Sequence, residues 1–395
     1  MSGTAPINAL RGGSKVLQTL SRSAGARRCL STTQARSNGE VITFNRESSP
    51  ELKSILEEIR EKIILPTYLS PDQRKKIYNP KHKARLERDP ITIEIDGKIH
   101  EFRYTNMVTD LPNTRKLVSK ALLEMKTSTD YKNIPHLLEG LCVRARRKLP
   151  DAYFTKMVRI ACMNGHSGMI VEMLKLPKRT GFQLTTHETI AELLTWLQYP
   201  AVEKGWEEKA TLKAYNRVNL VLELLETENL HTNKYARHPS EHLAFPFYRD
   251  PQFLAARLHL AAAQAVHSAP ETEKEKKEQE AKVKEVTAHA QQLLKLWPKN
   301  AGVLDLHPAE AHADKNALKY QMMRSTFVWH VSPVLNGLRL AQKVVGPQLA
   351  KQLEARAKKV EQELNDAVAQ IQAEGRGRAL YQKLFGETQT ENTTE

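Results

Sequence analysis

The chain has 395 residues and a formal net charge of +15, with 60 lysines and arginines against 45 aspartates and glutamates. No window approaches the ~18 consecutive apolar residues of a membrane-spanning helix, so no membrane span is predicted. The three cysteines include no closely spaced pair, which argues against a thiolate zinc site and against a disulfide. The cationic excess favours a polyanionic partner.

The first 39 residues carry six cations and no carboxylate, an imbalance that ends at Glu40. The segment is rich in Ser, Thr, Ala and Gly. A basic, acid-free amphipathic leader is typical of a mitochondrial transit peptide. We therefore predict that residues 1–30 direct the chain to the mitochondrial matrix and are removed before Ser31, and the loss of their five cations lowers the charge from +15 to +10. The alternative is a basic tail without a targeting role.

Residues 31–90 are predicted to form one helix and a basic arm. Apolar residues recur at helical spacing over residues 51–64, and Pro66 and the Ser70-Pro71 pair end the pattern. The tract that follows interleaves cations with one aromatic ring: Arg74, Lys75, Lys76, Tyr78, Lys81, Lys83, Arg85 and Arg88. Cations neutralise phosphates and an exposed ring stacks on a base. These residues are candidate RNA-binding residues, and the alternative is a solvated charged loop.

Residues 91–110 are predicted to contain a β-hairpin. The sequence ITIEIDGKIHEFRY alternates apolar and polar residues on both sides of Asp96-Gly97. An Asp-Gly pair favours a two-residue hairpin turn because both central positions need positive φ. Two strands are only marginally stable alone, so we expect this hairpin to pack on the following helices or on another molecule.

Residues 111–230 are predicted to form a domain of stacked antiparallel helical hairpins. Five apolar stripes at helical spacing begin near Leu117, Ile134, Phe154, Met169 and Ile190, and short breaks rich in Pro, Gly or Asn separate them. Helices joined by tight turns pair side by side. No single stripe can be buried by its own helix, so the hairpins are expected to stack.

A second basic cluster ends the second of these helical patterns. It consists of Arg144, Arg146, Arg147 and Lys148. Cations at a helix C-terminus also complement the helix dipole, which stabilises the helix by ~0.3–1 kcal/mol each. Four cations in five residues exceed what capping requires, so we add them to the candidate RNA-binding residues and keep dipole complementation as the alternative. Lys175, Lys178 and Arg179 follow the next hairpin and would share an edge with this cluster if the hairpins stack in parallel.

Residues 231–385 are predicted to be a C-terminal helical region. Helical patterns cover 238–268 and 345–372. Between them, residues 270–287 are a charge-alternating spacer, which is either a solvated helix or disordered. Gly375-Arg376-Gly377-Arg378 is interpreted as a flexible basic break, and residues 386–395 as a disordered tail.

The sequence DLHPAEAHAD places Asp305, His307, Glu310, His312 and Asp314 within ten residues, but in none of the usual metal-ligand spacings. No phosphate-binding glycine loop and no nucleophile motif is present in the sequence. We therefore predict no metal site, no cofactor, no small-molecule substrate and no catalytic activity.

Residues 152–190 resemble one unit of the pentatricopeptide-type helical hairpin, whose period is about 35 residues. The unit reads as helix, Asn164-Gly165-His166 turn and second helix, and the corresponding starts at Tyr153 and His187 are 34 residues apart. The flanking units match only loosely, so no base-recognition residues are transferred. The fold class is therefore predicted as mainly α, with stacked tetratricopeptide- or pentatricopeptide-like hairpins, a small β-hairpin and extended basic segments.

As a whole, the chain resembles fungal mitochondrial ribosomal proteins. The resemblance lies in the leader RRCLSTTQAR, the basic tract RKKIYNPKHKARLER, the helical body and the charged tail. It implies a structural role in the mitochondrial ribosome, expected in the large subunit, with rRNA bound by basic segments and other mitochondrial ribosomal proteins bound by helical faces. Two alternatives remain: a free mitochondrial RNA-binding factor and a protein–protein scaffold or assembly factor.

Overall fold

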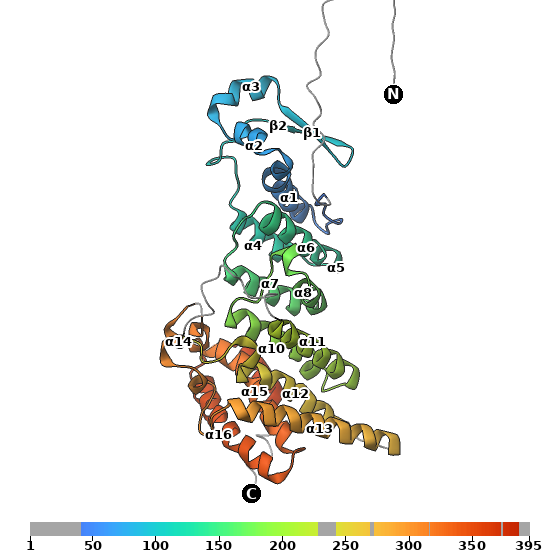
Figure 1. The fold of residues 1–395 in the computed structure, drawn as a ribbon, viewed down its shortest axis with the longest axis vertical. Coiled ribbons are helices and arrows are strands. Elements are labelled where there is room, and N and C mark those ends of the chain that lie inside the picture. Colours follow the sequence, from blue (N-terminus) through green and yellow to red (C-terminus); the bar gives the residue numbers. More distant parts are fainter. Residues whose placement is uncertain (1–40, 228–241, 269–271, 316, 373, 387–395) are drawn as a thin grey trace, which may run out of the picture.

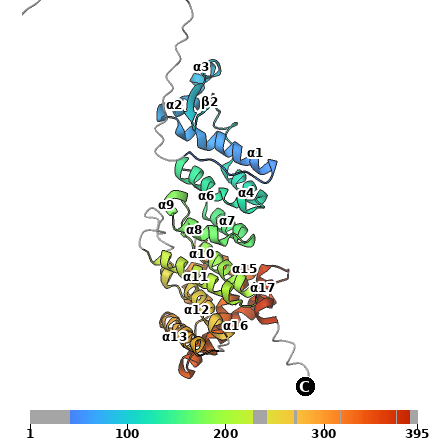
Figure 2. The same cartoon turned by 90° about the vertical axis from the view of Figure 1, so that its right-hand side faces the viewer.

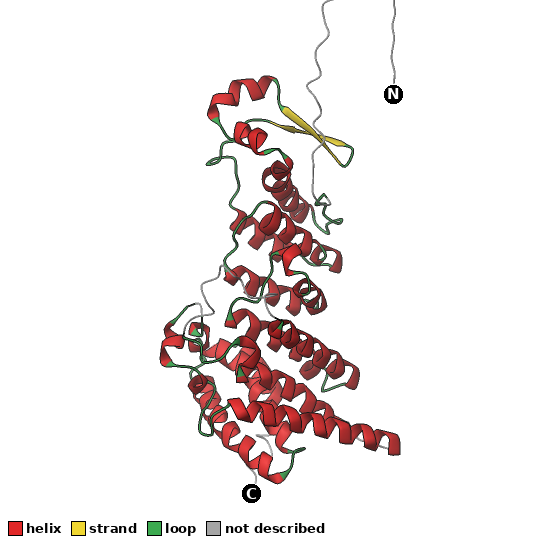
Figure 3. Ribbon diagram, in the orientation of Figure 1, coloured by secondary structure: helices red, strands yellow, loops and turns green. Residues whose placement is uncertain are grey.

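The computed structural model describes residues 41–227, 242–268 and 272–386, apart from residues 316 and 373. These residues form an elongated stack of helices with one pair of strands at its N-terminal end (Figures 1 and 3). The predicted fold class is confirmed. The predicted transit peptide and the predicted C-terminal tail, except for Gly386, lie outside the described residues.

The stack begins with α1 (Pro50–Ile59), which continues as a π-helical turn (Arg60–Ile64) and a 3-10 turn (Leu65–Tyr68), as predicted for residues 51–64. The Ser49 side chain caps α1 by accepting a hydrogen bond from the Leu52 N–H. The segment before α1 is held by Asp130, which accepts hydrogen bonds from Ser48 and Thr127. Burial opposes the ionisation of Asp130, but these bonds outweigh it and lower its pKa to about 2.

The basic tract is folded and is not the extended arm that we expected. It forms α2 (Pro71–Ile77), a 3-10 turn (Pro80–His82) and α3 (Lys83–Arg88). These short helices pack on the predicted hairpin of β1 (Ile91–Ile95) and β2 (Lys98–Phe102). A small second core joins them, and its buried members are Leu65, Leu69, Ile77, Leu86, Ile93, Ile95 and Phe102. The hairpin is therefore supported by the helices that precede it.

The hairpin has the register and the turn that the sequence indicates. Ile95 pairs with Lys98 and Ile91 with Phe102, and both Asp96 and Gly97 have positive φ. Alternation along the strands places Ile93 and Ile95 in the small core. The opposite face carries Glu94, Glu101 and Ile99, whose side chains are exposed.

The five predicted apolar stripes all lie on helices, and most of their residues are buried in the main core. The helices of this region are α4 (Thr114–Glu124), α5 (Ser128–Tyr131), α6 (Asn133–Leu138) with its π-helical extension (Glu139–Arg144), α7 (Asp151–Met163), α8 (Ser167–Leu174), α9 (Pro177–Thr180), α10 (His187–Glu203) and α11 (Glu208–Glu226). The hairpins α7–α8 and α10–α11 stack through α7 and α10. Thr155 and Thr189, one 34-residue period apart, share a hydrogen bond of 2.7 Å.

The C-terminal region continues the stack. Its helices are α12 (Pro251–His267), α13 (Glu273–Leu296), α14 (Ala309–Ala313), α15 (Arg324–Gln342), α16 (Pro347–Ala369) and α17 (Arg376–Phe385). The charge-alternating run forms most of α13, whose N-terminal end projects from the stack (Figure 1). Thr272 and Glu275 form a capping box that starts this helix. The run is therefore a solvated helix, one of the two forms that we left open.

Helix α15 lies at the centre of this region and packs against α12, α16 and α17. Two close approaches depend on glycine. A Cβ on Gly337 would lie 2.9 Å from the His259 Cα on α12, and a Cβ on Gly377 would lie 2.3 Å from the Ser325 carbonyl oxygen. Larger side chains at these positions would separate the helices. The two views in Figures 1 and 2 show how α15 is enclosed by its neighbours.

None of the described helices combines the length and the apolar character that crossing a membrane requires. Cys162 is buried and Cys142 is half-buried, and both are free thiols. Burial raises the pKa of Cys142 to about 11 and raises that of Cys162 further. Both side chains therefore pack as small apolar groups, as predicted.

Glu363 on α16 makes stability depend on pH near neutrality. It accepts hydrogen bonds from the backbone N–H groups of Val303 (2.7 Å) and Leu304 (3.1 Å). Burial outweighs these bonds and raises its pKa to about 7 from an ordinary 4.5. Because the native state holds this proton more tightly than the unfolded state, stability should fall as pH rises from about 4.5 to 7.

We expect the free energy of unfolding of Glu363→Gln to fall by about 1–2 kcal/mol less than that of the wild type over this pH range, because glutamine cannot ionise. Urea unfolding of both proteins at several pH values between 5 and 8 measures the difference. Glu361→Gln, on the same helix and half-exposed, is the matched control and should leave the decline unchanged. Parallel pH profiles of the wild type and the Glu363 variant would contradict this assignment.

Candidate nucleic-acid interface

The first basic tract lies on the surface of the N-terminal unit. Burial of Ile77 and Leu86 fixes α2 and α3 on the hairpin and turns the cations of both helices outward. The exposed cations are Lys75, Lys76, Lys81, Lys83, Arg85 and Arg88, whereas Arg74 is half-buried. Lys83 lies 5.7 Å from the centre of the Tyr104 ring. The tract is therefore a rigid display of cations and not a flexible arm.

Tyr78 occupies the C-terminal end of α2 and packs against the small core. Burial raises the pKa of its phenol, although the guanidinium groups of Arg147 and Arg74 lie close enough to oppose the shift. Its ring is thus half-covered by protein. It offers less surface for stacking on a base than the sequence pattern indicated.

The second cluster lies at the end of the π-helical extension of α6. The guanidinium of Arg144 lies 5.8 Å from the centre of the Tyr68 ring, and Tyr68 packs against both cores. Arg146 has a positive φ of 51°, and the Arg147 N–H donates to the Leu141 carbonyl. Arg146, Arg147 and Lys148 have exposed side chains. The chain reverses here before α7.

The structure brings these two clusters together at the boundary between the two cores. Arg147 acts electrostatically on Tyr78, as Arg74 does, and Arg144 covers Tyr68. We call Arg74, Arg144 and Arg147, with the two rings, the cationic junction. Residues about 70 positions apart in sequence therefore contribute to one surface. Nothing in the spacing of the sequence indicated that the clusters meet.

A third basic group lies on the neighbouring helix α9. Helix α9, which carries Lys178 and Arg179, contacts the π-helical extension of α6, and Arg179 Nε lies 2.9 Å from the Glu139 carboxylate. Gly181 ends α9 with a φ of 69°, and a Cβ there would lie 2.7 Å from the Cys142 Cβ. Helix α9 therefore lies beside the helix that leads into the second cluster, and Arg179 is paired with a carboxylate there; the shared basic edge stays a prediction.

The outer face of the β-hairpin does not continue the cationic surface. It carries the carboxylates of Glu94 and Glu101, and Ile99 is 70% exposed. Carboxylates repel phosphates, and although Glu101 is paired with Arg103 at 3.5 Å, this face offers RNA less than the cationic surface does. It is better suited to a protein neighbour.

One buried cluster has the composition of a metal site. The ligand atoms of His187, Asp250 and His307 lie within 4.8 Å of one another, and all three residues are buried. The Ala244 N–H donates to His307 Nδ1 at 3.2 Å, so the proton of this neutral imidazole is on Nε2. That proton is donated to Asp250 Oδ2 at 3.1 Å. His307 Nε2 is therefore unavailable to a metal ion.

The rest of this cluster is also satisfied by hydrogen bonds. His187 Nε2 lies 2.9 Å from Asp250 Oδ2, and its Nδ1 lies 2.7 Å from the Tyr320 hydroxyl. Asp250 Oδ1 accepts from the Gln252 N–H at the start of α12. The cluster links α10 and α12 with the segment before α14, and its role is structural. The acidic and histidine residues around His307 point elsewhere: His312 bonds to the Leu304 carbonyl and Asp305 to the Gly302 N–H.

The fold and the surface place the chain in the class of helical-hairpin proteins that bind other macromolecules. The cations that would contact a polyanion lie on the surface of the N-terminal end of the stack. The sequence profile of the family described as mitochondrial ribosomal protein mS27 matches residues 28–384. The chain is also 41% identical over 394 residues to the small ribosomal subunit protein mS27 of Neurospora crassa, covering 98% of this chain and 99% of that protein.

The chain therefore belongs to the mitochondrial ribosomal protein mS27 family. It is a structural component of the mitochondrial ribosome and not an enzyme. The expectation of a large-subunit protein is wrong, because the Neurospora relative is a small-subunit protein. The sequence features that we used are the basic charge, the leader and the helical pattern. All three occur equally well in a protein of either subunit, so they could not distinguish the small subunit from the large one.

Proposed function

We propose that this chain is built into the small subunit of the mitochondrial ribosome in the matrix, where its cationic residues hold rRNA and its helical faces hold neighbouring proteins. The observation that carries the proposal is the cationic junction, where two separate basic clusters meet on a rigid support. Lys and Arg side chains replace the counterions of rRNA phosphates, which provides affinity without sequence recognition. Sequence recognition is unnecessary where the shape of the RNA is already set by the particle.

Membership of a ribosomal family favours this function over a free RNA-binding factor or an assembly scaffold. The residues proposed to contact rRNA are those of the two clusters: Arg74, Lys75, Lys76, Lys81, Lys83, Arg85, Arg88, Arg144, Arg146, Arg147 and Lys148. Tyr78 is proposed to support the junction through its ring edge. The acidic face of the hairpin is proposed to face a protein.

Charge reversal tests the anchor. We expect the quadruple variant Lys75→Glu, Lys76→Glu, Lys81→Glu and Lys83→Glu to be released from small subunits at moderate salt. Loss of about four phosphate contacts should reduce the slope of log affinity against log salt by about 3–4. Sucrose-gradient sedimentation across a salt series, with quantitative mass spectrometry of the subunit fraction, measures both effects.

The matched control reverses four exposed lysines on α13, namely Lys274, Lys276, Lys277 and Lys284. It changes the net charge equally and should remain bound. Full co-sedimentation of the α2–α3 variant in moderate salt would show that this surface is not an anchor. Equal release of both variants would show that net charge matters and that the surface does not.

A further inference from the structure

An open groove between α8 and α11 belongs to neither cationic cluster. It has a volume of about 410 Å³. Its apolar lining consists of Val171, Leu212 and Leu220, and the Leu212 side chain is 47% exposed. An aliphatic side chain left in water at the floor of a groove favours an apolar partner group.

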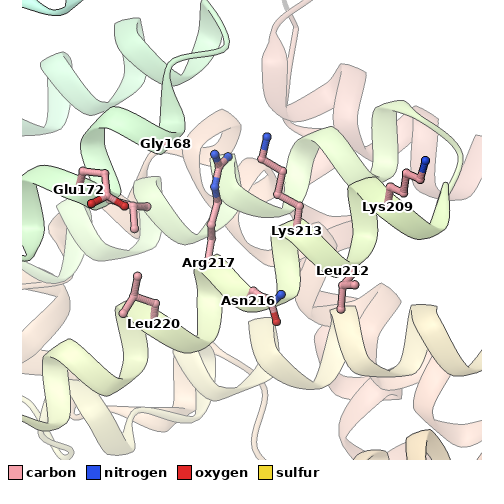
Figure 4. A pocket seen from close by; sticks show the side chains of 9 residues that line it. Gly168, Glu172, Lys209, Leu212, Lys213, Asn216, Arg217 and Leu220 are labelled. Atoms are coloured by element: carbon pink, nitrogen blue, oxygen red, sulfur yellow. The ribbon is translucent and has the colours of Figure 1, made fainter. Parts of the chain in front are cut away.

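One rim of the groove is a row of cations on α11. Lys209, Lys213 and Arg217 follow one another at intervals of four residues, which corresponds to about 6 Å per step along a helix. Their side chains extend from the same side of α11, as Figure 4 shows. Neither Lys209 nor Lys213 makes an ion pair with any residue that the structure describes.

Arg217 is held in place at the end of this row. Its Nη1 donates to the Ser167 hydroxyl at 2.9 Å. A Cβ on Gly168 would lie 2.6 Å from Arg217 Nη2, so the absence of a side chain there lets the guanidinium lie against the first turn of α8. The row thus combines one fixed cation with two that have no described anionic partner.

The opposite rim carries a carboxylate. Glu172 on α8 lines the groove and pairs with Lys175 at 2.7 Å. Among the residues that the structure describes, none that lines the groove is aromatic, so this part of the groove lacks the stacking platform that single-stranded RNA uses. The groove has an aliphatic floor, a row of cations on one rim and a carboxylate on the other. This combination suits a peptide that carries both aliphatic and charged side chains better than it suits RNA.

We propose that this groove docks an amphipathic acidic helix from another protein of the small subunit. Aliphatic side chains of that helix would cover Leu212 and Leu220, in the usual manner of a helix in a groove. Carboxylates at one-turn spacing would pair with Lys209 and Lys213. The proposal rests on the proposed function, since it assumes that the chain resides in the ribosomal small subunit.

The experiment uses intact small subunits that contain the full chain with photoreactive p-benzoylphenylalanine in place of Asn216, an exposed residue of the groove. We expect irradiation to join it to a protein segment that has acidic residues at one-turn spacing and aliphatic residues between them. Adding Lys209→Glu and Lys213→Glu should lower the cross-link yield by roughly tenfold, because like charges would then face one another. The matched pair Lys116→Glu and Lys120→Glu, exposed on α4 at the same spacing, should not change the yield.

Four outcomes would overturn the docking proposal: a cross-link to rRNA, a cross-link to a segment without acidic residues, no cross-link in particles that contain the chain, or a cross-link yield that the Lys209 and Lys213 reversals do not change. Absence of the wild-type chain from small subunits in the sedimentation experiment would instead refute the proposed function. The two failures are therefore distinguishable.

Discussion

Replacing Glu192 by glutamine is expected to destabilise the chain by roughly 3 kcal/mol, towards the lower end of the range for breaking a buried ion pair. The Glu192 carboxylate is only 1% exposed. It accepts hydrogen bonds from both terminal nitrogens of Arg376 and from the Trp196 indole, and Arg159 Nε lies 3.4 Å away. Removing its charge leaves the Arg376 guanidinium without its ion-pair partner, and the more distant Glu188 carboxylate compensates only in part. The Arg376 side chain is 29% exposed, and water there reduces the cost.

The second effect of this substitution should be local. Arg376 begins α17 and also lies 5.1 Å from the centre of the Trp329 ring. Without Glu192, α17 loses its principal polar attachment to α10. We therefore expect faster tryptic cleavage after Arg376 and Arg378, together with a lower urea midpoint.

The matched control is Glu203→Gln. Glu203 pairs with Lys383 between the same two helices, but both side chains are about half exposed. Exposed pairs contribute about 0–1 kcal/mol, so this variant should stay close to the wild type. Equal unfolding midpoints and equal cleavage rates for the two variants would contradict the role assigned to Glu192.

Asp250→Asn is expected to cost about 3 kcal/mol or more, since hydrogen bonds to a buried carboxylate are lost. Asp250 Oδ2 accepts hydrogen bonds from His187 and His307, while Oδ1 accepts one from the Gln252 N–H and so caps α12. An asparagine that keeps the cap through its oxygen turns its amide nitrogen towards the N–H groups of the two imidazoles. Three donor nitrogens, one amide and two imidazole, then face one another without an acceptor.

Thermal unfolding of Asp250→Asn, compared with Asp151→Asn at an exposed position, measures this loss. Asp151 accepts one side-chain hydrogen bond, from Thr185, at the surface. Its replacement should change stability by less than about 1 kcal/mol. Similar melting temperatures for the two variants would show that the buried network does not carry the stability assigned to it.

The same network predicts acid sensitivity. Burial opposes the ionisation of Asp250, but the two imidazoles outweigh it and hold its pKa below the ordinary range. Burial also lowers the pKa of His187, and outside this network it lowers that of His259, which bonds to Gln198, to about 3. The native state therefore binds fewer protons than the unfolded state. Stability from these groups is complete above about pH 6.5 and declines as the pH falls, and the Asp250 part of that decline should be absent in Asp250→Asn.

Prediction from the sequence was most accurate where a pattern is local. The apolar stripes, the Asp-Gly turn and the 34-residue hairpin period each depend on neighbours within a few turns, and each was found. It was least accurate where a residue acts at long range. Arg376 was interpreted as part of a flexible break, yet its guanidinium binds Glu192, 184 residues earlier.

Two other departures have the same cause. Helix α15 was not predicted, although it is a central helix of the C-terminal region. It is apolar on most sides because other helices surround it, and so it lacks a single stripe. Its Pro333 also resembles a helix break. The basic tract was expected to be extended because it contains few apolar residues. Ile77 and Leu86 stabilise its helices only when the hairpin packs over them and buries them.

Local patterns were sufficient to predict the helical class, the hairpin, the excess of cations and the resemblance to mitochondrial ribosomal proteins, because charge, turn chemistry and apolar period are properties of short segments. The folded structure was needed to show that two basic clusters join around Tyr68 and Tyr78, that His307 donates a hydrogen bond to Asp250, and that α8 and α11 leave a groove between them. Packing produces these features, because burying the apolar stripes sets which distant side chains become neighbours.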